Sequence, residues 1–304
     1  MKKILILALC VLLLSGCSTK REKTLFAMDT EIQLTVYGKK KAMEKAEQEI
    51  ARLSEKYSVE NLEKAIKNYD AETEEILKTA EKIKKETDGA FDVNIAPVMR
   101  IWGFYSHEFS EKNHRVPTPS EIEEALLTAS SGEYKDLGGI AKGYCADRVV
   151  KLLKEENVKS AVLSLGGNVA LIGSKPDGSP FTVGIKSPFD ESLYATVKAE
   201  DTMIVTSGDY VRYFEENGKR YHHIINPKTG YPQESNLKSV TIISDSGIYA
   251  DGLSTALFVM GKDKAIAYWQ KYRDFGMILI DIDGKIFATD KVEINTEHAI
   301  EIIK

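Results

Sequence analysis

The sequence is poor in cysteine and has no apolar run long enough to cross a membrane as a helix. Only three cysteines occur among its 304 residues. Cys10 lies inside an apolar N-terminal segment and Cys17 follows that segment, so Cys145 is the one cysteine left in the rest of the chain. A disulfide within the folded domain is therefore excluded. The apolar segment itself, residues 4–14, is too short for a stable transmembrane helix.

Positive charge is in deficit. The chain has 41 lysines and arginines against 46 aspartates and glutamates, a net charge of −5, and loss of Lys2 and Lys3 with a secretion signal would leave −7. An acidic domain repels the phosphate backbone of nucleic acids, so no nucleic-acid partner is expected. A polyphosphate substrate would have to be neutralised locally, by a metal ion or by backbone N–H groups.

The N-terminus has the pattern of an exported lipoprotein. A short positive segment precedes the apolar run, which ends in Leu14-Ser15-Gly16-Cys17, small residues before a cysteine. We expect residues 1–16 to be a signal peptide, Cys17 to be lipidated, and residues 17–24 to be a polar tether. The protein would then lie outside the cytoplasm, anchored to the cell membrane. The alternative is an ordinary signal peptide with a cysteine there by chance.

Periodicity predicts helices first and mostly short strands afterwards, within one large domain spanning residues 25–304. Ser120 with Glu123 has the pattern of a capping box for a helix that runs to residue 129. Gly166-Gly167-Asn168 between two apolar runs indicates a hairpin. An α+β fold is therefore favoured over a doubly wound parallel sheet. Further helices are expected at residues 39–57, 70–86, 143–156, 250–260 and 262–272, and strands at residues 31–37, 161–165, 169–172, 182–185, 193–197, 203–206, 220–225, 239–243, 277–282 and 285–289.

A glycine-rich stretch opens directly into one of the predicted helices. In Asp136-Leu-Gly-Gly-Ile-Ala-Lys-Gly-Tyr144 the glycines let the backbone approach a ligand closely, and N–H groups at the helix start could receive a diphosphate. The stretch is neither a Walker A loop nor a dinucleotide-binding G-x-G-x-x-G motif. Taken alone, an ordinary strand-to-helix turn explains it as well.

Two residues of a later helix could share a cation. Asp251 and Thr255 are four residues apart and therefore lie on one helix face, where a carboxylate and a hydroxyl would reach the same hard cation. The alternative is that Asp251 caps its own helix and Thr255 bonds back to the preceding turn.

Adjacent histidines occur in a predicted strand. His222 and His223 must point to opposite faces, so one of them can enter a site and the other is expected at the surface. A purely structural histidine is the alternative. Upstream, Gly89-Ala90-Phe91-Asp92 combines small, aromatic and acidic residues, which suit an aromatic ligand or an ordinary packed turn.

Taken in order, these segments resemble the ApbE family, the FAD:protein FMN transferases, across nearly the whole mature chain. The resemblance implies an α+β fold related to the T-fold, with a mixed or antiparallel sheet and packed helices. It also implies an extracytoplasmic, Mg²⁺-dependent enzyme that moves FMN from FAD onto a threonine or serine hydroxyl of an acceptor flavoprotein and releases AMP. The matching stretches are Ala27-Met-Asp-Thr30, Thr87-Asp-Gly-Ala-Phe-Asp92 with Trp102-Gly-Phe104, Asp136 to Tyr144, Leu165-Gly-Gly-Asn168, Thr206-Ser-Gly-Asp-Tyr210, His223-Ile-Ile-Asn-Pro-Lys-Thr-Gly230 and Ala250-Asp-Gly-Leu-Ser-Thr255.

The resemblance also assigns roles to residues. It places Mg²⁺ on the carbonyl of Ala141 and the side chains of Asp251 and Thr255, and it makes His223 the candidate for proton transfer. A cation with oxygen ligands beside a glycine-rich helix start would neutralise the diphosphate of FAD in an otherwise acidic protein. Around FAD the resemblance places Met28, Ala90, Phe91, Asp92, Asp136, Lys142 and Ile225.

The chain departs from the family pattern at two places. Asn226 stands where family members usually carry aspartate, and residues 58–69 lack a sequence of the Asp-Ser-Glu-x-Ser-Arg type. Three other functions remain open: an FAD pyrophosphatase that gives FMN and AMP with water as acceptor, a lipoprotein that binds FAD without catalysis, and an envelope module that binds an unrelated anion.

Overall fold

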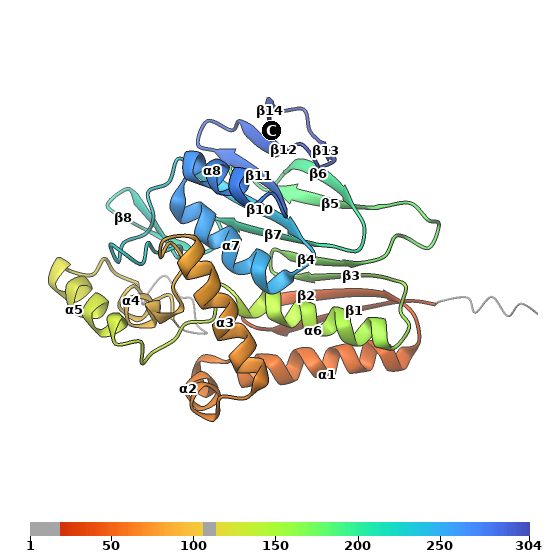
Figure 1. Cartoon of the computed structure of the whole chain (residues 1–304), viewed down its shortest axis with the longest axis horizontal. Coiled ribbons are helices and arrows are strands. Elements are labelled where there is room, and N and C mark those ends of the chain that lie inside the picture. Colours follow the sequence, from red (N-terminus) through yellow and green to blue (C-terminus); the bar gives the residue numbers. More distant parts are fainter. Residues whose placement is uncertain (1–18, 106–113) are drawn as a thin grey trace, which may run out of the picture.

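A nine-stranded sheet runs through the middle of the molecule, with helices on one face and a three-stranded sheet on the other (Figure 1). The computed structural model describes residues 19–105 and 114–304, so the predicted signal peptide and Cys17 lie outside the described residues. The strands are β1 (Lys20–Ala27), β2 (Thr30–Tyr37), β3 (Ser160–Leu165), β4 (Asn168–Ile172), β5 (Phe181–Lys186), β6 (Leu193–Ala199), β7 (Met203–Gly208), β8 (Tyr213–Glu216), β9 (Lys219–His222), β10 (Leu237–Ser244), β11 (Gly276–Asp281), β12 (Ile286–Thr289), β13 (Ile294–Asn295) and β14 (Ile300–Ile303).

The large sheet has the order β1-β2-β3-β4-β7-β10-β11-β12-β14 and is antiparallel except where β12 pairs with β14. The small sheet has the order β13-β6-β5. Phe181, Val183 and Ile185 of β5 point inward and pack against Ile204 and Ile278 of the large sheet. Mostly antiparallel strands with helices gathered on one side confirm the predicted α+β class.

The side chains along β2 explain why this segment is a strand. Ile32, Leu34 and Val36 are buried, whereas Glu31 and Gln33 are exposed. This period-two alternation buries one face of the strand in the main core and leaves the other face to polar residues. The strand predicted for residues 31–37 is confirmed.

The edge strand β1 was not predicted. Its sequence is largely polar, but its backbone pairs with β2 from Lys20 opposite Tyr37 to Ala27 opposite Thr30. Charged side chains on an edge strand are a common defence against unwanted strand pairing, so polarity here does not exclude a strand. The tether predicted for residues 17–24 is therefore wrong from Lys20 onward.

Helices cover the face of the large sheet opposite β5 and β6 (Figure 1). The helices predicted for residues 39–57, 70–86, 143–156, 250–260 and 262–272 are confirmed with small shifts at their ends. No helix in residues 19–105 and 114–304 has the length and apolarity to cross a membrane. The helices are α1 (Lys40–Lys56), α2 (Val59–Asn68), α3 (Ala71–Glu86), η1 (Val93–Ile95, a 3-10 turn), α4 (Ala96–Ile101), α5 (Pro119–Ser130), α6 (Ala141–Glu155), α7 (Gly247–Met260) and α8 (Lys262–Tyr272).

The capping box of α5 lies two residues before the predicted one. The Thr118 hydroxyl accepts a hydrogen bond from the Glu121 N–H at 3.3 Å, and the Glu121 carboxylate accepts one from the Thr118 N–H at 2.8 Å. Pro119 occupies the first helical position, where its missing N–H costs nothing. The prediction of Ser120 with Glu123 is therefore wrong, although both pairs have the required spacing.

The close crossing of α6 and α7 fixes the part of the core nearest the site. A methyl group at Gly143 would fall 2.1 Å from the carbonyl oxygen of Gly247, so the two backbones meet where neither residue has a side chain. Helix α7 is buried along nearly its whole length and packs on β7 and β10. The β1–β2 and β3–β4 turns, the last residues of β7 and the start of α6 lie together at one end of the large sheet.

Candidate functional site

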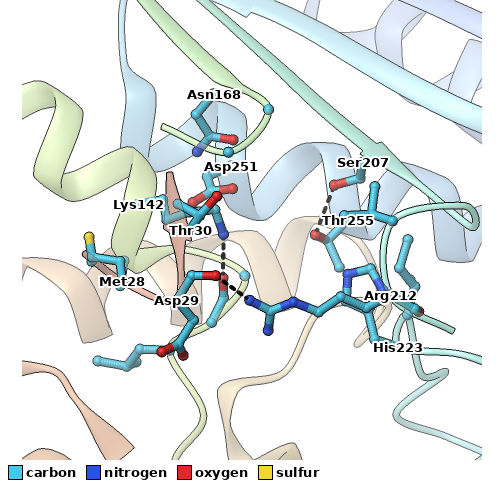
Figure 2. Close-up of a pocket in the computed structure, with 18 of the residues that line it drawn as sticks. Met28, Asp29, Thr30, Lys142, Asn168, Ser207, Arg212, His223, Asp251 and Thr255 are labelled. Carbon is cyan, nitrogen blue, oxygen red and sulfur yellow. Dashed lines mark hydrogen bonds between the residues drawn. The ribbon is translucent and has the colours of Figure 1, made fainter. Parts of the chain in front are cut away.

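A cavity of about 810 Å³ lies at that end of the sheet, within the size range typical of small-molecule sites. Figure 2 shows side chains of the large sheet and of the helices pointing into this cavity. The structure thus brings together all eleven residues to which a binding or catalytic role was assigned, although they are spread over most of the chain. They are Met28, Ala90, Phe91, Asp92, Asp136, Ala141, Lys142, His223, Ile225, Asp251 and Thr255.

A strained hairpin turn brings Met28 to the cavity. Ala27 pairs with Thr30, so only two residues join β1 to β2. Both have a positive φ, 51° for Met28 and 57° for Asp29, as a type I′ turn requires. Side chains such as methionine seldom adopt this conformation, and strain of this kind collects at functional sites. The N–H of Met28 donates to the Ser54 hydroxyl of α1 at 2.9 Å, which holds the turn in place.

Two aspartates tie the starts of α6 and α7 together. Asp251 of α7 accepts a hydrogen bond from the N–H of Gly143 in α6, at 2.8 Å. In return, Asp147 of α6 accepts hydrogen bonds from the N–H groups of Gly247 (2.7 Å) and Ile248 (2.9 Å) at the start of α7. Burial raises the pKa of Asp147 to about 6, against the effect of these two donors. The reciprocal contacts hold the Asp251 carboxylate beside the start of α6.

Asp251 does not cap its own helix, so that alternative is wrong. Ser246 caps α7 through the N–H of Tyr249, at 3.4 Å. The Thr255 hydroxyl does not bond back to the preceding turn either, because its partner is the Ser207 hydroxyl at 3.2 Å. Both predicted cation ligands therefore face the cavity instead of serving the helix backbone (Figure 2).

The donors near Asp251 fit a hard cation. The Asp251 side chain is only 4% exposed and accepts one hydrogen bond from the described part of the chain, and a buried carboxylate requires further compensation. Within residues 19–105 and 114–304 no three His, Cys, Asp or Glu side chains gather as a metal cluster. One carboxylate, the Thr255 hydroxyl and the Ala141 carbonyl are the sparse oxygen set that suits Mg²⁺, whose remaining positions go to water and phosphate.

Arg212 and Asn168 line the same cavity and were not predicted. Arg212 reaches across it toward the Asp29 carbonyl, with a long contact of 3.4 Å (Figure 2). Lys142 adds a second cation and donates to the Gly138 carbonyl at 3.1 Å. The buried amide nitrogen of Asn168 has no hydrogen-bond partner in the described part of the chain. Two cations and an unused amide donor are what a phosphate group would require.

The His223 ring is held in one tautomer. Its Nδ1 lies 3.2 Å from the Arg212 carbonyl oxygen. Because a carbonyl only accepts hydrogen bonds, Nδ1 carries the proton and Nε2 keeps its lone pair. Burial, and then the positive charge of Arg212, lower the pKa of His223 to about 3. The imidazole is therefore neutral at physiological pH and can accept a proton at Nε2.

His222 has a structural role, and the prediction that it lies at the surface is wrong. It is buried, and its ring packs edge-on against Phe258. Its Nε2 donates to the Gln233 carbonyl at 3.0 Å, while its Nδ1 accepts from the N–H of Ile224 at 3.2 Å. The strand predicted for residues 220–225 ends at His222 as β9, so the chain turns before His223 reaches the cavity.

The remaining predicted ligand contacts surround the glycine-rich stretch. Gly139 passes so close to Phe91 that a methyl group on it would lie 3.1 Å from the ring. The Asp136 carboxylate accepts from the N–H of Gly138 at 2.7 Å, and desolvation raises its pKa. Asp92 caps the η1 turn and pairs with Lys84 at 2.7 Å. These contacts shape the wall of the cavity around one aromatic ring.

The two departures from the family pattern have local structural accounts. Asn226 closes a turn, since its amide donates to the Gln233 side chain at 2.8 Å and its oxygen accepts from the N–H of Lys228 at 2.9 Å. Residues 58–69 contain helix α2, capped by Ser58, and Leu62 of this helix lines the cavity. This stretch therefore forms part of the cavity wall in this chain.

Comparison with known proteins bears on the family of the chain. The ApbE family model matches residues 28–279. The FAD:protein FMN transferase of Haemophilus influenzae is 35% identical over 223 residues, which are 66% of this chain and 64% of that protein. The FAD:protein FMN transferase of Escherichia coli K12 is 32% identical over 238 residues, 71% of this chain and 66% of that protein. The chain thus spans about two thirds of the length of these relatives.

A solved structure extends the comparison to the whole fold. The ApbE protein of Thermotoga maritima is 33% identical and superposes with a TM-score of 0.80, covering 88% of this chain and 96% of that one. The fold and family predicted from the order of seven short stretches are confirmed. This chain belongs to the ApbE family.

Proposed function

We propose that this protein transfers FMN from FAD to a threonine or serine hydroxyl of an acceptor flavoprotein, in a Mg²⁺-dependent reaction that releases AMP. Relatives named FAD:protein FMN transferase support the transfer. For this chain the proposal rests on one observation: a carboxylate with spare capacity for a cation, Asp251, and a neutral base, His223, open onto the same cavity.

The proposed step exchanges one phosphorus–oxygen bond for another. The acceptor hydroxyl oxygen attacks the phosphorus of the FMN half of FAD, the bond to the bridging oxygen breaks, and AMP leaves with the electron pair. Nε2 of His223 takes the hydroxyl proton, which its held tautomer allows. Because the His223 ring is neutral, its Nε2 is already unprotonated and can accept the proton of the acceptor hydroxyl directly.

The other residues bind and orient the substrate. Asp251, Thr255 and the Ala141 carbonyl would hold Mg²⁺, which when bound neutralises charge on the diphosphate. Lys142 and Arg212 would add positive charge around the phosphates. The apolar side chains Met28, Phe91 and Ile225 would pack against the ring systems of FAD.

A single incubation tests the proposal against its rivals. The purified protein, FAD, Mg²⁺ and a candidate acceptor flavoprotein are mixed, and flavin fluorescence on a denaturing gel is measured together with AMP release. We expect a fluorescent acceptor band and AMP in equal amounts. AMP without a band would identify a pyrophosphatase, and neither product would identify a protein that only binds FAD or another anion. Replacing each Thr and Ser of the labelled acceptor peptide in turn locates the hydroxyl.

We further propose that Cys17 is the lipidated N-terminus and holds the protein outside the cytoplasm at the cell membrane. The apolar run that ends in Leu14-Ser15-Gly16-Cys17 supports this. Cys17→Ala should leave unprocessed precursor or release soluble protein, as judged by membrane fractionation and by mass. Cys145→Ala is the matched control, because this thiol is buried in α6 and should not affect processing. A Cys17→Ala protein that is cleaved and membrane-bound like wild type would contradict lipidation.

A further inference from the structure

The end of the molecule where the described chain begins carries an excess of positive charge. The N–H of Gly38 donates to the Thr19 carbonyl at 3.2 Å, and Arg21 donates to the Gly38 carbonyl at 3.1 Å. The first described residue therefore lies beside the start of α1, where three exposed lysines follow one another (Figure 1). They are Lys39, Lys40 and Lys41.

The positive charge of these three lysines is unfavourable at the start of a helix. The start of a helix carries partial positive charge and favours acidic residues, yet α1 has none in its first turn. Lys39 at the N-cap position makes no side-chain capping bond. In a chain with net charge −5, three consecutive cations at this place are hard to explain by folding alone.

Neighbouring acids neutralise only part of this charge. Lys40 pairs with Glu44 one turn along α1. Glu156, at the end of α6, pairs with Lys45, and Lys41 and Lys39 lie close enough to help lower the pKa of its carboxyl group after that pairing. Lys39 and Lys41 form no ion pair with any residue in 19–105 and 114–304. Glu44 and Glu156 thus offset only part of the charge of Lys39, Lys40, Lys41 and Lys45, and Lys20 pairs with Glu22 on the neighbouring strand.

The cavity lies at the opposite end of the same two elements. β1 has eight residues and leads from Lys20 to Met28, which lines the cavity; at roughly 3.3 Å per residue it covers about 26 Å. α1 has 17 residues and ends next to Tyr57, which also lines the cavity; at roughly 1.5 Å per residue it covers about 25 Å. Both lengths separate the basic end from the site by a similar distance.

We propose that this basic end, Lys39 to Lys41 with Lys20 and Arg21, rests on the anionic lipid headgroups of the membrane that holds Cys17. The sequence indicates that the partner of the basic end is the membrane, because only Ser18 separates Cys17 from the first described residue. An anchor this short brings the start of β1 to the lipid surface, where lysines are attracted to anionic lipid. The cavity is thereby held about 25 Å above the membrane, open to an acceptor domain that projects from the same surface. The proposal rests on lipidation of Cys17.

The test separates the charge effect from the lipid anchor. A protein that begins at Thr19 contains every described strand, helix and core residue, so we expect it to fold without the signal segment and Cys17. Its sedimentation with vesicles of phosphatidylcholine alone is compared with vesicles that also contain phosphatidylglycerol. We expect binding only to the anionic vesicles, and weaker binding as salt concentration rises.

Replacing Lys39, Lys40 and Lys41 by glutamine should weaken this binding on the order of 100-fold, at about fivefold per lysine. The matched control replaces three exposed lysines of α3, Lys78, Lys82 and Lys85, and should bind like wild type. Melting temperature should not fall in the first variant, since those lysines oppose the helix dipole.

Equal losses of vesicle binding in both triple variants, or equal binding to neutral and anionic vesicles, would overturn the proposal. FMN transfer to a soluble acceptor should be unchanged in the Lys39–Lys41 variant. If the wild-type protein transfers no FMN but still binds anionic vesicles through these lysines, the proposed function is contradicted and the proposed contact with anionic lipid is supported.

Discussion

Replacing Asp251 by asparagine should abolish Mg²⁺-dependent FMN transfer while the protein keeps its fold. Asparagine can still accept the hydrogen bond from the N–H of Gly143, so the junction of α6 and α7 is preserved. It lacks the negative charge of the Asp251 carboxylate, which is the only carboxylate in the proposed ligand set. Cation-based stabilisation of phosphoryl transfer is worth several kcal/mol, so we expect a loss on the order of a thousandfold in rate. Chelator should have the same effect on the wild-type protein.

The metal site also predicts a result that does not depend on activity. Mg²⁺ with FAD should raise the melting temperature of the wild-type protein and not that of Asp251→Asn, because only a ligand bound by the folded state stabilises it. Asp147→Asn is the matched control: it makes the same change at the same helix junction but lies outside the cavity lining. It should lower the melting temperature and leave the Mg²⁺ dependence of transfer intact. An Asp251→Asn protein that is active and insensitive to chelator would contradict the metal site.

Several strands and helices were predictable from the sequence because each has a local pattern of apolar, polar and capping residues. β2 alternates Ile32, Leu34 and Val36 with polar residues, and α3 has Asp70 as N-cap, acids in its first turn and lysines in its last. β1 gives no such signal: its eight residues form a strand because β2 offers an unpaired edge, which is a property of the sheet. Helix α2 was not predicted; it has only 10 residues, and Leu62 and Ala65 are its buried side chains.

The site was predicted through the order of its segments, and the contacts that refine it come from residues far apart in sequence. Asp251 meets Gly143 across 108 positions of the chain. Arg212 reaches Asp29 across 183 positions. No local pattern marks Arg212 as part of a site, and the role of His222 depends on its contacts with Phe258 and the Gln233 carbonyl. Charge and hydrogen-bonding capacity are set in these cases by tertiary neighbours, which periodicity does not reveal.

His223→Ala should lower the rate of FMN transfer by ~10²–10⁴-fold at saturating FAD and Mg²⁺, the usual loss for a positioned acid or base. The ring is fixed through Nδ1 on the Arg212 carbonyl, so Nε2 alone is available to take the hydroxyl proton. Because burial and Arg212 hold the pKa of His223 near 3, the base stays unprotonated when pH falls through 6.5, the ordinary histidine value. The wild-type rate should therefore show no loss attributable to this group until far more acidic pH.

His222→Ala is the matched control, since it removes the same side chain one residue earlier. Its expected effect is on stability: the N–H of Ile224 and the Gln233 carbonyl lose their partner in a buried setting, at a cost of ~1–3 kcal/mol in the free energy of unfolding. Its rate per folded molecule should remain near that of wild type. Melting temperature and single-turnover transfer, measured on both variants, separate the two roles. Equal and small rate losses would remove His223 from the mechanism, and a rate that falls with a pKa near 6.5 would show that the base is more exposed to solvent than its contacts with Arg212 and Phe104 imply.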